Sequence, residues 1–594
     1  MYQEPGTTRS AIVIRPLQRI RWWYVALLLI AGLAIVRLFY LQVIRHNYYQ
    51  LSAYSAQLKQ YEVPANRGII SAYDGNTVVP LVLNETLFTL YADPSFVDNP
   101  QEVATALQPI IGGNVDDIRA LAAQPDTRYV VLAKKLTREQ KDRVDALELK
   151  GIGTQDAPYR TYPDGALAAQ LLGFVNAEGK GTYGIEQALD EQLRGVPGAL
   201  KAVTDVNGVP LPANSDNKIV DPVPGDNVTL TLDIGLQQQV EDTLRDYVAA
   251  TQSETGSVVV LEAETGAVKA MANYPTYDPA NYAAVEDAEL FTNPVVSQPL
   301  EVGSIMKTLT VASAIDQGLV TAQTTYYDPG FYQVDDATIK NVEEDGGAGS
   351  KSMEDLLRLS LNTGATWLLM QMGGGEINQQ ARERWYDYLV KHYQLGQETG
   401  IEQGYEATGF VPEPNDGWGL NITYANTAFG QGVSATMLQM SAAFAAALNG
   451  GIYYQPHLVA TVERPDGAAE PYAPRIVREG VVDPSVSSDM QNLLETVFRK
   501  NRRFYTDREF SDAYSVGGKT GTAQIAKPDG GYYDDRFNGT YLGFVGGDRA
   551  EYIIAVRMTN PRVAGYAGTT AAAPVFGEVA TMLINNFGVS PRSQ

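Results

Sequence analysis

A long apolar run near the N-terminus dominates the pattern of hydrophobic and polar positions along the chain. The segment RWWYVALLLIAGLAIVRLFYLQVI runs from Arg21 to Ile44 and is almost entirely apolar between Trp22 and Val36. As an α-helix rising about 1.5 Å per residue, residues 22–44 would span about 34 Å, enough for a bilayer core of about 30 Å. Arg37 lies near the outer end, where a long side chain reaches the interface. We therefore expect residues 22–44 to form a transmembrane helix.

The charges before this segment predict its orientation. Only one acid, Glu4, stands among the arginines that precede the run, so the positive-inside rule places residues 1–21 in the cytoplasm and the chain after residue 45 outside. A cleaved signal peptide and a buried core helix are the alternatives. The run is long for a signal peptide, lacks a convincing small-residue cleavage site and carries aromatic residues at its ends. The arginines are Arg9, Arg15, Arg19 and Arg21.

Residues 45–220 show a mixed pattern. Short β-like runs such as TLFTLYA (residues 86–92) alternate with alanine-rich helical stretches, and Gly, Pro and Asp break the apolar clusters. This pattern predicts an elongated α+β pedestal. The stretch LPANSDNKIVDPVPGDN is rich in Pro, Asn and Asp and marks a boundary near Asp221.

The pattern of helical and β-like segments over residues 221–588 predicts one larger domain. Helical patterns over residues 234–251, 304–317 and 437–448 lie between an early β-like segment, GSVVVLEAETGAVKAMANY, and late ones, YSVGGKTGTAQIA, GTYLGFVGG and EYIIAVRM. Strands that bracket helices in this way predict an antiparallel sheet in which the two ends of the domain meet, with helices on both faces. The fold class is therefore multidomain α/β, of the α+β kind, with a short polar tail over residues 589–594.

Composition limits the classes of function. A chain of 594 residues is too long for one ordinary core. Its 45 Lys and Arg against 69 Asp and Glu give a formal net charge of -24, which disfavours nucleic acid as a partner. There is no cysteine, so disulfides, thiolate metal sites and a thiol nucleophile are excluded. We expect no metal and no cofactor.

The stretch EVGSIMK, residues 301–307, holds a candidate nucleophile and its base. If a helix begins at Ser304, Lys307 lies one turn later on the same face. A lysine acts as a base only when it is substantially neutral, so its pKa must fall, and burial beside apolar residues or a second cation favours this. Taken alone, the spacing is also typical of a helix cap followed by a solvated lysine.

Two further motifs follow in order. LSLNTGA contains Ser360, Leu361 and Asn362, and GGKTGTA contains Lys519 and the three residues after it. S-x-x-K, an S-x-N element and K-T-G together resemble the serine acyltransferases that include penicillin-binding proteins and class A β-lactamases. Singly, each motif also fits a helix cap or an ordinary edge strand.

The resemblance implies a role for each motif. Ser304 would attack a D-alanyl carbonyl and Lys307 would take its proton, so that the reaction passes through an acyl-enzyme. Ser360 would relay a proton toward the leaving amine, and Asn362 would bond a substrate amide. The donor peptide's carboxylate would contact Lys519, Thr520 and Thr522, with Gly521 allowing close approach and the backbone N–H groups of Ser304 and Thr522 forming the oxyanion hole.

The chain resembles more narrowly the monofunctional class B penicillin-binding proteins, and division-type more than elongation-type members. RGIISAYDGN (residues 67–76) is similar to an arginine-glycine motif of their pedestal, and residues 160–198, with Gly184 and Glu186, to their interdomain block. AFGQGVSATMLQM, NGGIYYQPHLV and AAPVF match blocks of the transpeptidase domain. Val302 replaces a usual proline, which we expect to loosen the turn before Ser304, and Pro294 replaces a common arginine.

This resemblance implies a D,D-transpeptidase of the bacterial cell membrane that cross-links peptidoglycan stem peptides during cell-wall synthesis at the septum and is acylated by β-lactams. The chain lacks the E-D-x-x-F-x-x-H signature of a glycosyltransferase, so a multi-spanning glycan polymerase is the expected partner. A D,D-carboxypeptidase or β-lactamase is one alternative, although the E-x-x-L-N element of class A β-lactamases is missing. A penicillin sensor or division scaffold without turnover is another.

Overall fold

The structure is a computed structural model that describes residues 16–46, 58–63, 65–125, 127–203, 218–341, 347–527 and 530–593. Two features of the sequence analysis lie outside these residues: the arginines Arg9 and Arg15, and most of the polar linker before Asp221. The chain divides into two compact units, Met1–Ala65 with Val196–Val223 and Asn66–Gly195 with Pro224–Gln594.

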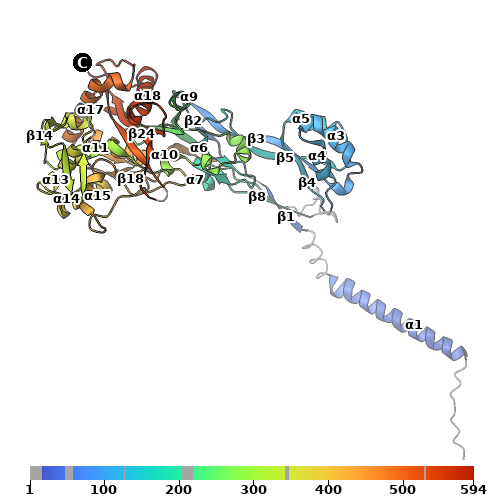
Figure 1. The fold of residues 1–594 in the computed structure, drawn as a ribbon. Helices are drawn as coiled ribbons and strands as arrows, with labels where there is room; N and C mark the ends of the chain where they lie inside the picture. Colours follow the sequence, from blue (N-terminus) through green and yellow to red (C-terminus); the bar gives the residue numbers. More distant parts are fainter. Residues whose placement is uncertain are drawn as a thin grey trace, which may run out of the picture. The chain divides into compact units, whose positions relative to one another are not determined.

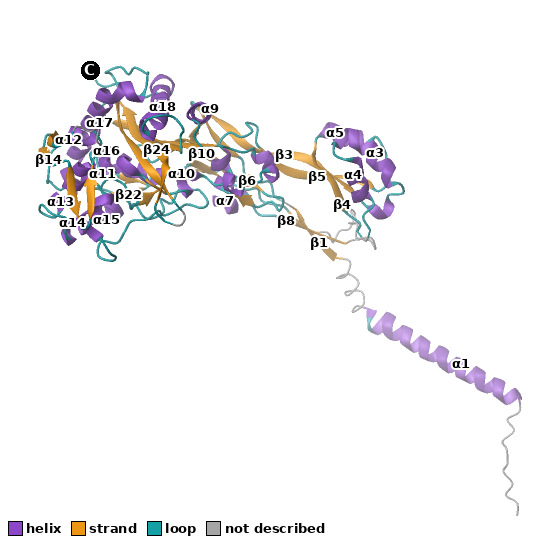
Figure 2. Ribbon diagram, viewed as in Figure 1, coloured by secondary structure: helices purple, strands orange, loops and turns teal. Residues whose placement is uncertain are grey.

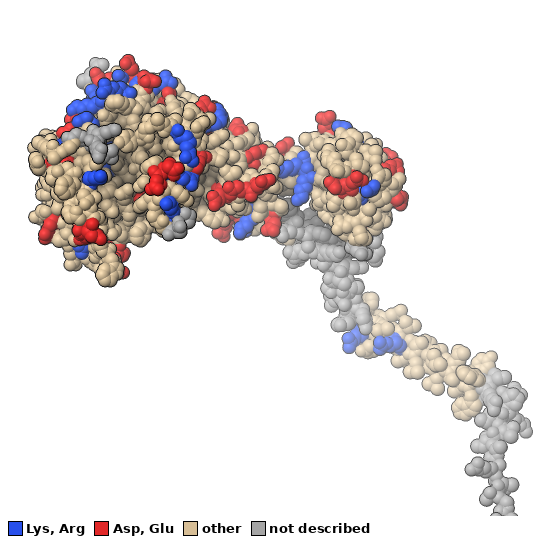
Figure 3. All heavy atoms as spheres, viewed as in Figure 1, with Lys and Arg blue, Asp and Glu red and all other residues tan. Residues whose placement is uncertain are grey.

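The first unit contains the apolar helix. α1 (Pro16–Phe39) continues into a π-helical turn, η1 (Tyr40–Ile44). The segment Arg21–Ile44 contains an 18-residue window with a mean hydropathy of 2.3 and is long and apolar enough to cross a membrane. Figure 3 shows basic atoms near one end of its described surface and no acidic atoms along it. The same unit holds a three-stranded antiparallel sheet in the order β1 (Leu58–Val63), β8 (Gly198–Val203) and β9 (Lys218–Val220).

The second unit begins with a seven-stranded sheet. The order is β21 (Ala469–Pro471), β20 (Val459–Glu463), β10 (Asn227–Asp233), β2 (Ile70–Asp74), β3 (Thr77–Ala92) and β4 (Val130–Leu136), and β5 (Ile152–Thr161) also pairs with β3. β10 and β2 run parallel, and the other pairs of the sheet are antiparallel. Strands from both sides of the predicted boundary near Asp221 therefore share this sheet (Figure 1).

Three helices pack on the far part of β3. α3 (Pro100–Ile111), α4 (Val115–Ala122) and α5 (Arg138–Asp145) enclose a small core that includes Phe88, Leu107 and Leu136. α5 begins with a capping box, in which Thr137 and Gln140 satisfy each other's backbone N–H groups. This part of the chain therefore has a hydrophobic core of its own.

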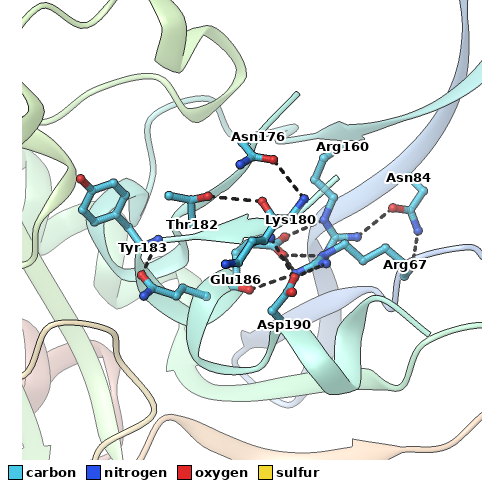
Figure 4. Close-up of polar contacts among 11 residues, drawn as sticks. Arg67, Asn84, Arg160, Asn176, Lys180, Thr182, Tyr183, Glu186 and Asp190 are labelled. Atoms are coloured by element: carbon cyan, nitrogen blue, oxygen red, sulfur yellow. Dashed lines mark hydrogen bonds and ion pairs between the residues drawn. The ribbon is translucent and has the colours of Figure 1, made fainter. Parts of the chain in front are cut away.

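A buried ionic network fixes the short elements between this sheet and the larger domain (Figure 4). Glu186 is fully buried in α7 (Gly184–Ala188) and accepts hydrogen bonds from Arg67 Nε at 2.6 Å and Arg160 Nε at 2.7 Å. Arg67 also donates to Asp190 at 2.7 Å, and Arg160 to Asn84 at 2.9 Å. Arginine forks suit carboxylates at such buried sites, so the network ties the arginine-glycine motif to the interdomain block.

The larger domain is built on a five-stranded antiparallel sheet in the order β12 (Val268–Tyr274), β11 (Thr255–Glu262), β25 (Ala550–Thr559), β24 (Tyr532–Gly546) and β23 (Ser515–Ala526). The early strand β11 pairs with the late strand β25, which confirms the predicted meeting of the two ends of the domain. β23 is an edge strand.

Helices cover both faces of this sheet, as predicted from the strands that bracket the helices in the sequence (Figure 2). Val258 and Val260 of β11 join one core with α9 (Ile234–Thr251) and α18 (Ala573–Asn586), whereas Val259 and Leu261 join another with α11 (Met306–Asp316) and α16 (Met437–Leu448). α12 (Met353–Arg358), α13 (Asn362–Met372), α14 (Gln379–Asp387), α15 (Leu420–Thr427) and α17 (Pro484–Tyr505) complete the domain.

Several short elements also belong to the domain. They are α10 (Pro294–Ser297), β13 (Leu300–Glu301), η5 (Gly303–Ile305), β14 (Thr325–Asp328), β15 (Phe331–Val334), β16 (Ala337–Lys340), β17 (Gly349–Ser352), β18 (Ser434–Ala435) and η7 (Gly568–Ala572).

Candidate active site

Ser304 lies in a tight turn rather than at the first turn of a regular α-helix. η5 is a 3-10 turn, and α11 begins only at Met306, so the helix predicted over residues 304–317 starts two residues later. Gly303 has a φ of 62° and donates its N–H to Gly430 O at 3.0 Å. A Cβ at this position would lie 3.1 Å from Thr522 O, so glycine suits both the conformation and the close approach to β23.

Val302 adopts the backbone conformation that proline would impose. Its φ is -74°, inside the range of a proline ring, and its side chain is fully buried. The turn therefore takes a proline-like conformation around a buried valine, and the expectation that valine loosens it stays a prediction.

Lys307 lies buried among oxygen atoms of the first two motifs. Its Nζ donates to Ser304 Oγ at 3.0 Å, Ser360 Oγ at 3.1 Å, Asn362 Oδ1 at 2.7 Å and Ser360 O at 2.5 Å. Each of these acceptors is uncharged. The amine is thus within hydrogen-bond reach of the hydroxyl that it would deprotonate.

The second motif spans the start of α13. Ser360 has a φ of 59°, in the left-handed region that non-glycine residues rarely adopt, and Asn362 is the first residue of the helix. This turn lets both the carbonyl and the hydroxyl of Ser360 meet Lys307. Strain held at such a turn is typical of functional sites.

The third motif lies on the edge strand β23. Lys519 is buried, and its Nζ donates to Thr520 O at 2.9 Å and Thr520 Oγ1 at 3.4 Å. Thr522 Oγ1 accepts the N–H of Gly568 at 3.1 Å. A Cβ on Gly521 would lie 3.0 Å from Val302 O, so β23 packs directly against the turn that holds Ser304.

The remaining groups are accessible. Ser304, Ser360, Asn362, Thr520 and Thr522 are half-buried, whereas the two lysines are buried. The residues that carry the hydroxyls and the amide thus keep some exposure to solvent, whereas both lysines are almost fully buried.

Glu301 is a residue of this region to which the sequence assigns no role. Its Oε1 accepts the N–H of Gly432 at 2.9 Å and the hydroxyl of Tyr532 at 2.7 Å. Burial and this hydrogen bond raise the pKa of Tyr532 to about 12, so the phenol remains a donor. The only signal in the sequence is a carboxylate three residues before Ser304.

Histidine takes no part in this cluster. His457 packs against Tyr472 with ring centroids 4.3 Å apart, and burial lowers its pKa. Its backbone N–H and O bond Gly266 O and the N–H of Val268. These contacts agree with a structural role for His457.

Comparisons with known proteins bear on the whole chain. The family model for the penicillin binding protein transpeptidase domain matches residues 256–581, and that for the penicillin-binding protein dimerisation domain matches residues 62–230. Penicillin-binding protein PbpB of Mycobacterium tuberculosis is 30% identical over 99% of this chain and 87% of its own length. The chain belongs to the penicillin-binding proteins.

Further relatives of this penicillin-binding protein carry the activity in their names. The peptidoglycan D,D-transpeptidase FtsI of Escherichia coli is 26% identical over 95% of this chain and 91% of its own length. A crystal structure of penicillin binding protein 3 from Mycobacterium tuberculosis, complexed with aztreonam, is 27% identical, with a TM-score of 0.66 over 89% of this chain and 98% of that one. The protein is a class B penicillin-binding protein and a serine-type peptidoglycan D,D-transpeptidase.

Proposed function

We propose that Ser304 is the nucleophile of this transpeptidase and that Lys307 is its base. The observation that carries the proposal is the position of Lys307 Nζ, which lies 3.0 Å from Ser304 Oγ while it contacts Ser360 and Asn362. Lys307 takes the hydroxyl proton as Ser304 Oγ bonds to the D-alanyl carbonyl carbon. Lys519 is the second cation that we expect to favour neutral Lys307.

The other motif residues complete the reaction. Ser360 passes the proton to the leaving D-alanine amine, and the backbone N–H groups of Ser304 and Thr522 bond the developing oxyanion. Lys519, Thr520 and Thr522 hold the terminal carboxylate of the donor peptide, Gly521 leaves room for it beside β23, and Asn362 bonds its amide. An acceptor amine then attacks the acyl ester, and Ser304 regains its proton.

The cellular setting is also proposed. The basic residues before the apolar segment 22–44 support a cytoplasmic N-terminus in a bacterial cell, with this segment crossing the inner membrane and the catalytic domain outside it. The resemblance to division-type members supports a septal role. A multi-spanning polymerase would supply the glycan strands whose stem peptides the enzyme joins, and β-lactams would acylate Ser304. The domain boundaries near residues 45 and 221 remain predictions.

Two alternatives differ from this proposal in their products. A D,D-carboxypeptidase or β-lactamase would pass the acyl group to water, and a sensor or scaffold would keep it. The test is the full-length protein in detergent with a stem-peptide thioester as donor and an added amine as acceptor. We expect an amide product that depends on the acceptor concentration and is lost in Ser304→Ala. Hydrolysis alone would favour a hydrolase, and a single stoichiometric acylation would favour a sensor.

A further inference from the structure

A buried carboxylate lies behind the second motif without taking part in the proposed chemistry. Asp328 ends β14 and is fully buried. Its Oδ1 accepts the N–H of Gly330 at 2.7 Å, and its Oδ2 accepts Thr363 Oγ1 at 2.6 Å and Asn341 Nδ2 at 3.2 Å. All three donors are uncharged. A buried anion is costly unless fixed dipoles stabilise it, so this position calls for an explanation.

The start of α13 supplies such dipoles. Thr363, the second residue of the helix, is fully buried beside Asp328. The N-terminus of an α-helix carries a partial positive charge, which favours a carboxylate there. Asp328 thus reaches the first turn of α13 from another segment through the hydroxyl of Thr363, with its carboxylate beside the positive end of the helix.

Asn341 contacts both Asp328 and Thr363, and its amide fixes which groups donate and which accept among the three residues. Asn341 Oδ1 accepts the N–H of Thr363 at 3.1 Å, and Asn341 Nδ2 donates to Thr363 Oγ1 at 2.7 Å. The threonine hydroxyl has one proton, and it goes to Asp328. Thr363 is therefore held through its backbone and its side chain at once.

The residue held in this way is the neighbour of Asn362. Asn362 Oδ1 meets Lys307 Nζ at 2.7 Å, and Ser360, two residues earlier, meets it through its carbonyl and hydroxyl. Among the residues that the structure describes, Asn362 Nδ2 reaches Lys340 O, at 3.5 Å. The tighter restraint on this turn comes from Thr363, so a shift of Thr363 would move both groups that contact Lys307.

We infer that Asp328 is a positioning residue, which acts through Thr363 and Asn341 to hold Ser360 and Asn362 against Lys307. The inference rests on the proposed roles of Ser304 and Lys307. It adds to the reaction a carboxylate that touches neither substrate nor the reacting atoms.

The test measures acylation of the full-length protein in detergent by a fluorescent penicillin, with the melting temperature taken in parallel. Thr363→Val keeps the γ-methyl group and removes the hydroxyl, and Thr363→Ser keeps the hydroxyl and removes the methyl group. We expect Thr363→Val to lower the second-order acylation rate constant about tenfold or more, the factor for about 1.4 kcal/mol. Thr363→Ser should stay within about threefold of the unchanged protein because its hydroxyl still reaches Asp328.

Coupling between the two residues gives a second readout. Asp328→Ala, which removes both acceptor oxygens, should also slow acylation. The double variant Asp328→Ala/Thr363→Val should be slowed by less than the product of the two single effects, since each single change breaks the same Asp328–Thr363 hydrogen bond. If Thr363→Val gives no folded protein, Asn341→Ala, at a half-buried position, takes its place. The inference would be overturned if the two single effects on the acylation rate simply multiplied in the double variant. It would also be overturned if the variants melted at a lower temperature but were acylated at the unchanged rate. Failure of the unchanged protein to label at Ser304 would instead refute the proposed function.

Discussion

The carboxylate of Glu301 accepts a hydrogen bond from the hydroxyl of Tyr532 at 2.7 Å, across 231 residues of sequence. Tyr532 is the first residue of β24, and Glu301 precedes the turn that carries Ser304. The same oxygen holds the N–H of Gly432. One carboxylate thus joins three segments around the nucleophile.

Removing the Tyr532 hydroxyl should loosen this junction. We expect Tyr532→Phe to slow acylation by penicillin between about threefold and tenfold, because a hydrogen bond to a partly exposed carboxylate contributes about 1 kcal/mol. The control is Tyr533→Phe, since the Tyr533 ring packs on Arg536 and keeps that contact without its hydroxyl. Equal rates for both variants would show that the Glu301 contact does not position Ser304.

Replacing Lys307 by arginine tests the base. Arginine keeps a cation and hydrogen-bond donors in the pocket but does not deprotonate in proteins. Acylation should fall roughly 10²–10⁴-fold, the usual contribution of a general base. Stopped-flow acylation kinetics check this, with Lys391→Arg at an exposed position as control. Fast acylation of the Lys307→Arg protein would show that a group other than Lys307 takes the proton from the Ser304 hydroxyl.

A proline at position 302 should be accepted. The φ of Val302 already suits proline, and Glu301 before it lies in a strand, the conformation that proline favours in its predecessor. Restricting the unfolded chain stabilises by about 0.4–1 kcal/mol, and the lost packing of a buried valine offsets this. We expect a similar melting temperature and acylation rate for Val302→Pro. A large drop in either would mean that the valine side chain itself shapes the turn.

The buried network of Figure 4 predicts a large loss of stability when Glu186 is neutralised. Glu186→Gln leaves Arg67 and Arg160 facing a neutral amide, and breaking a buried ion pair typically costs about 3–5 kcal/mol. Asp190→Asn is the matched control. Asp190 is partly exposed, and of Arg67 and Arg160 it pairs with Arg67 alone. Thermal unfolding should show a clearly lower midpoint for Glu186→Gln than for Asp190→Asn. The reverse order would contradict this account of the network.

Glu241 predicts a pH dependence of stability. It lies on α9, accepts the N–H of Ala168 and the amide of Gln237 at 2.7 Å each, and burial raises its pKa from 4.5 to about 7. The folded state binds the Glu241 proton more tightly than the unfolded state does. The stability that this proton contributes is therefore fully present below pH 4.5 and is lost as pH rises to about 7. The loss is on the order of 3 kcal/mol.

Glu241→Gln removes this titration and keeps an oxygen acceptor. Melting temperatures measured from pH 5 to pH 8 should therefore converge at low pH and favour the variant at high pH, with a flatter profile. Parallel profiles would show that Glu241 does not titrate in this range.

Local periodicity predicted what depends on local contacts. The helices predicted over residues 234–251 and 437–448 match α9, which buries one apolar stripe, and α16, which is apolar and buried on every side. The meeting of early and late strands in the five-stranded sheet was predicted from strands at both ends of one domain, whereas the order of the strands was not. The three motifs named Ser304, Lys307, Ser360, Asn362 and Lys519, and the structure brings Ser304, Lys307, Ser360 and Asn362 together.

Contacts between distant segments were beyond such patterns. Glu301 and Tyr532, or Asp328 and Thr363, are polar residues of ordinary appearance whose pairing arises only in the folded chain. The left-handed backbone conformation at position 360 is adopted by a serine, not by the glycine or asparagine that would have indicated it in the sequence. The addition of β20 and β21 to the seven-stranded sheet likewise depends on tertiary packing rather than on local sequence.

The central claim is that penicillin forms a covalent ester with Ser304. Full-length protein treated with benzylpenicillin should gain the mass of one penicilloyl group, and peptide mapping should place it on the fragment that contains Ser304. The Ser304→Ala protein should gain nothing under the same conditions. An adduct on another residue, or an equal adduct on Ser304→Ala, would contradict the account.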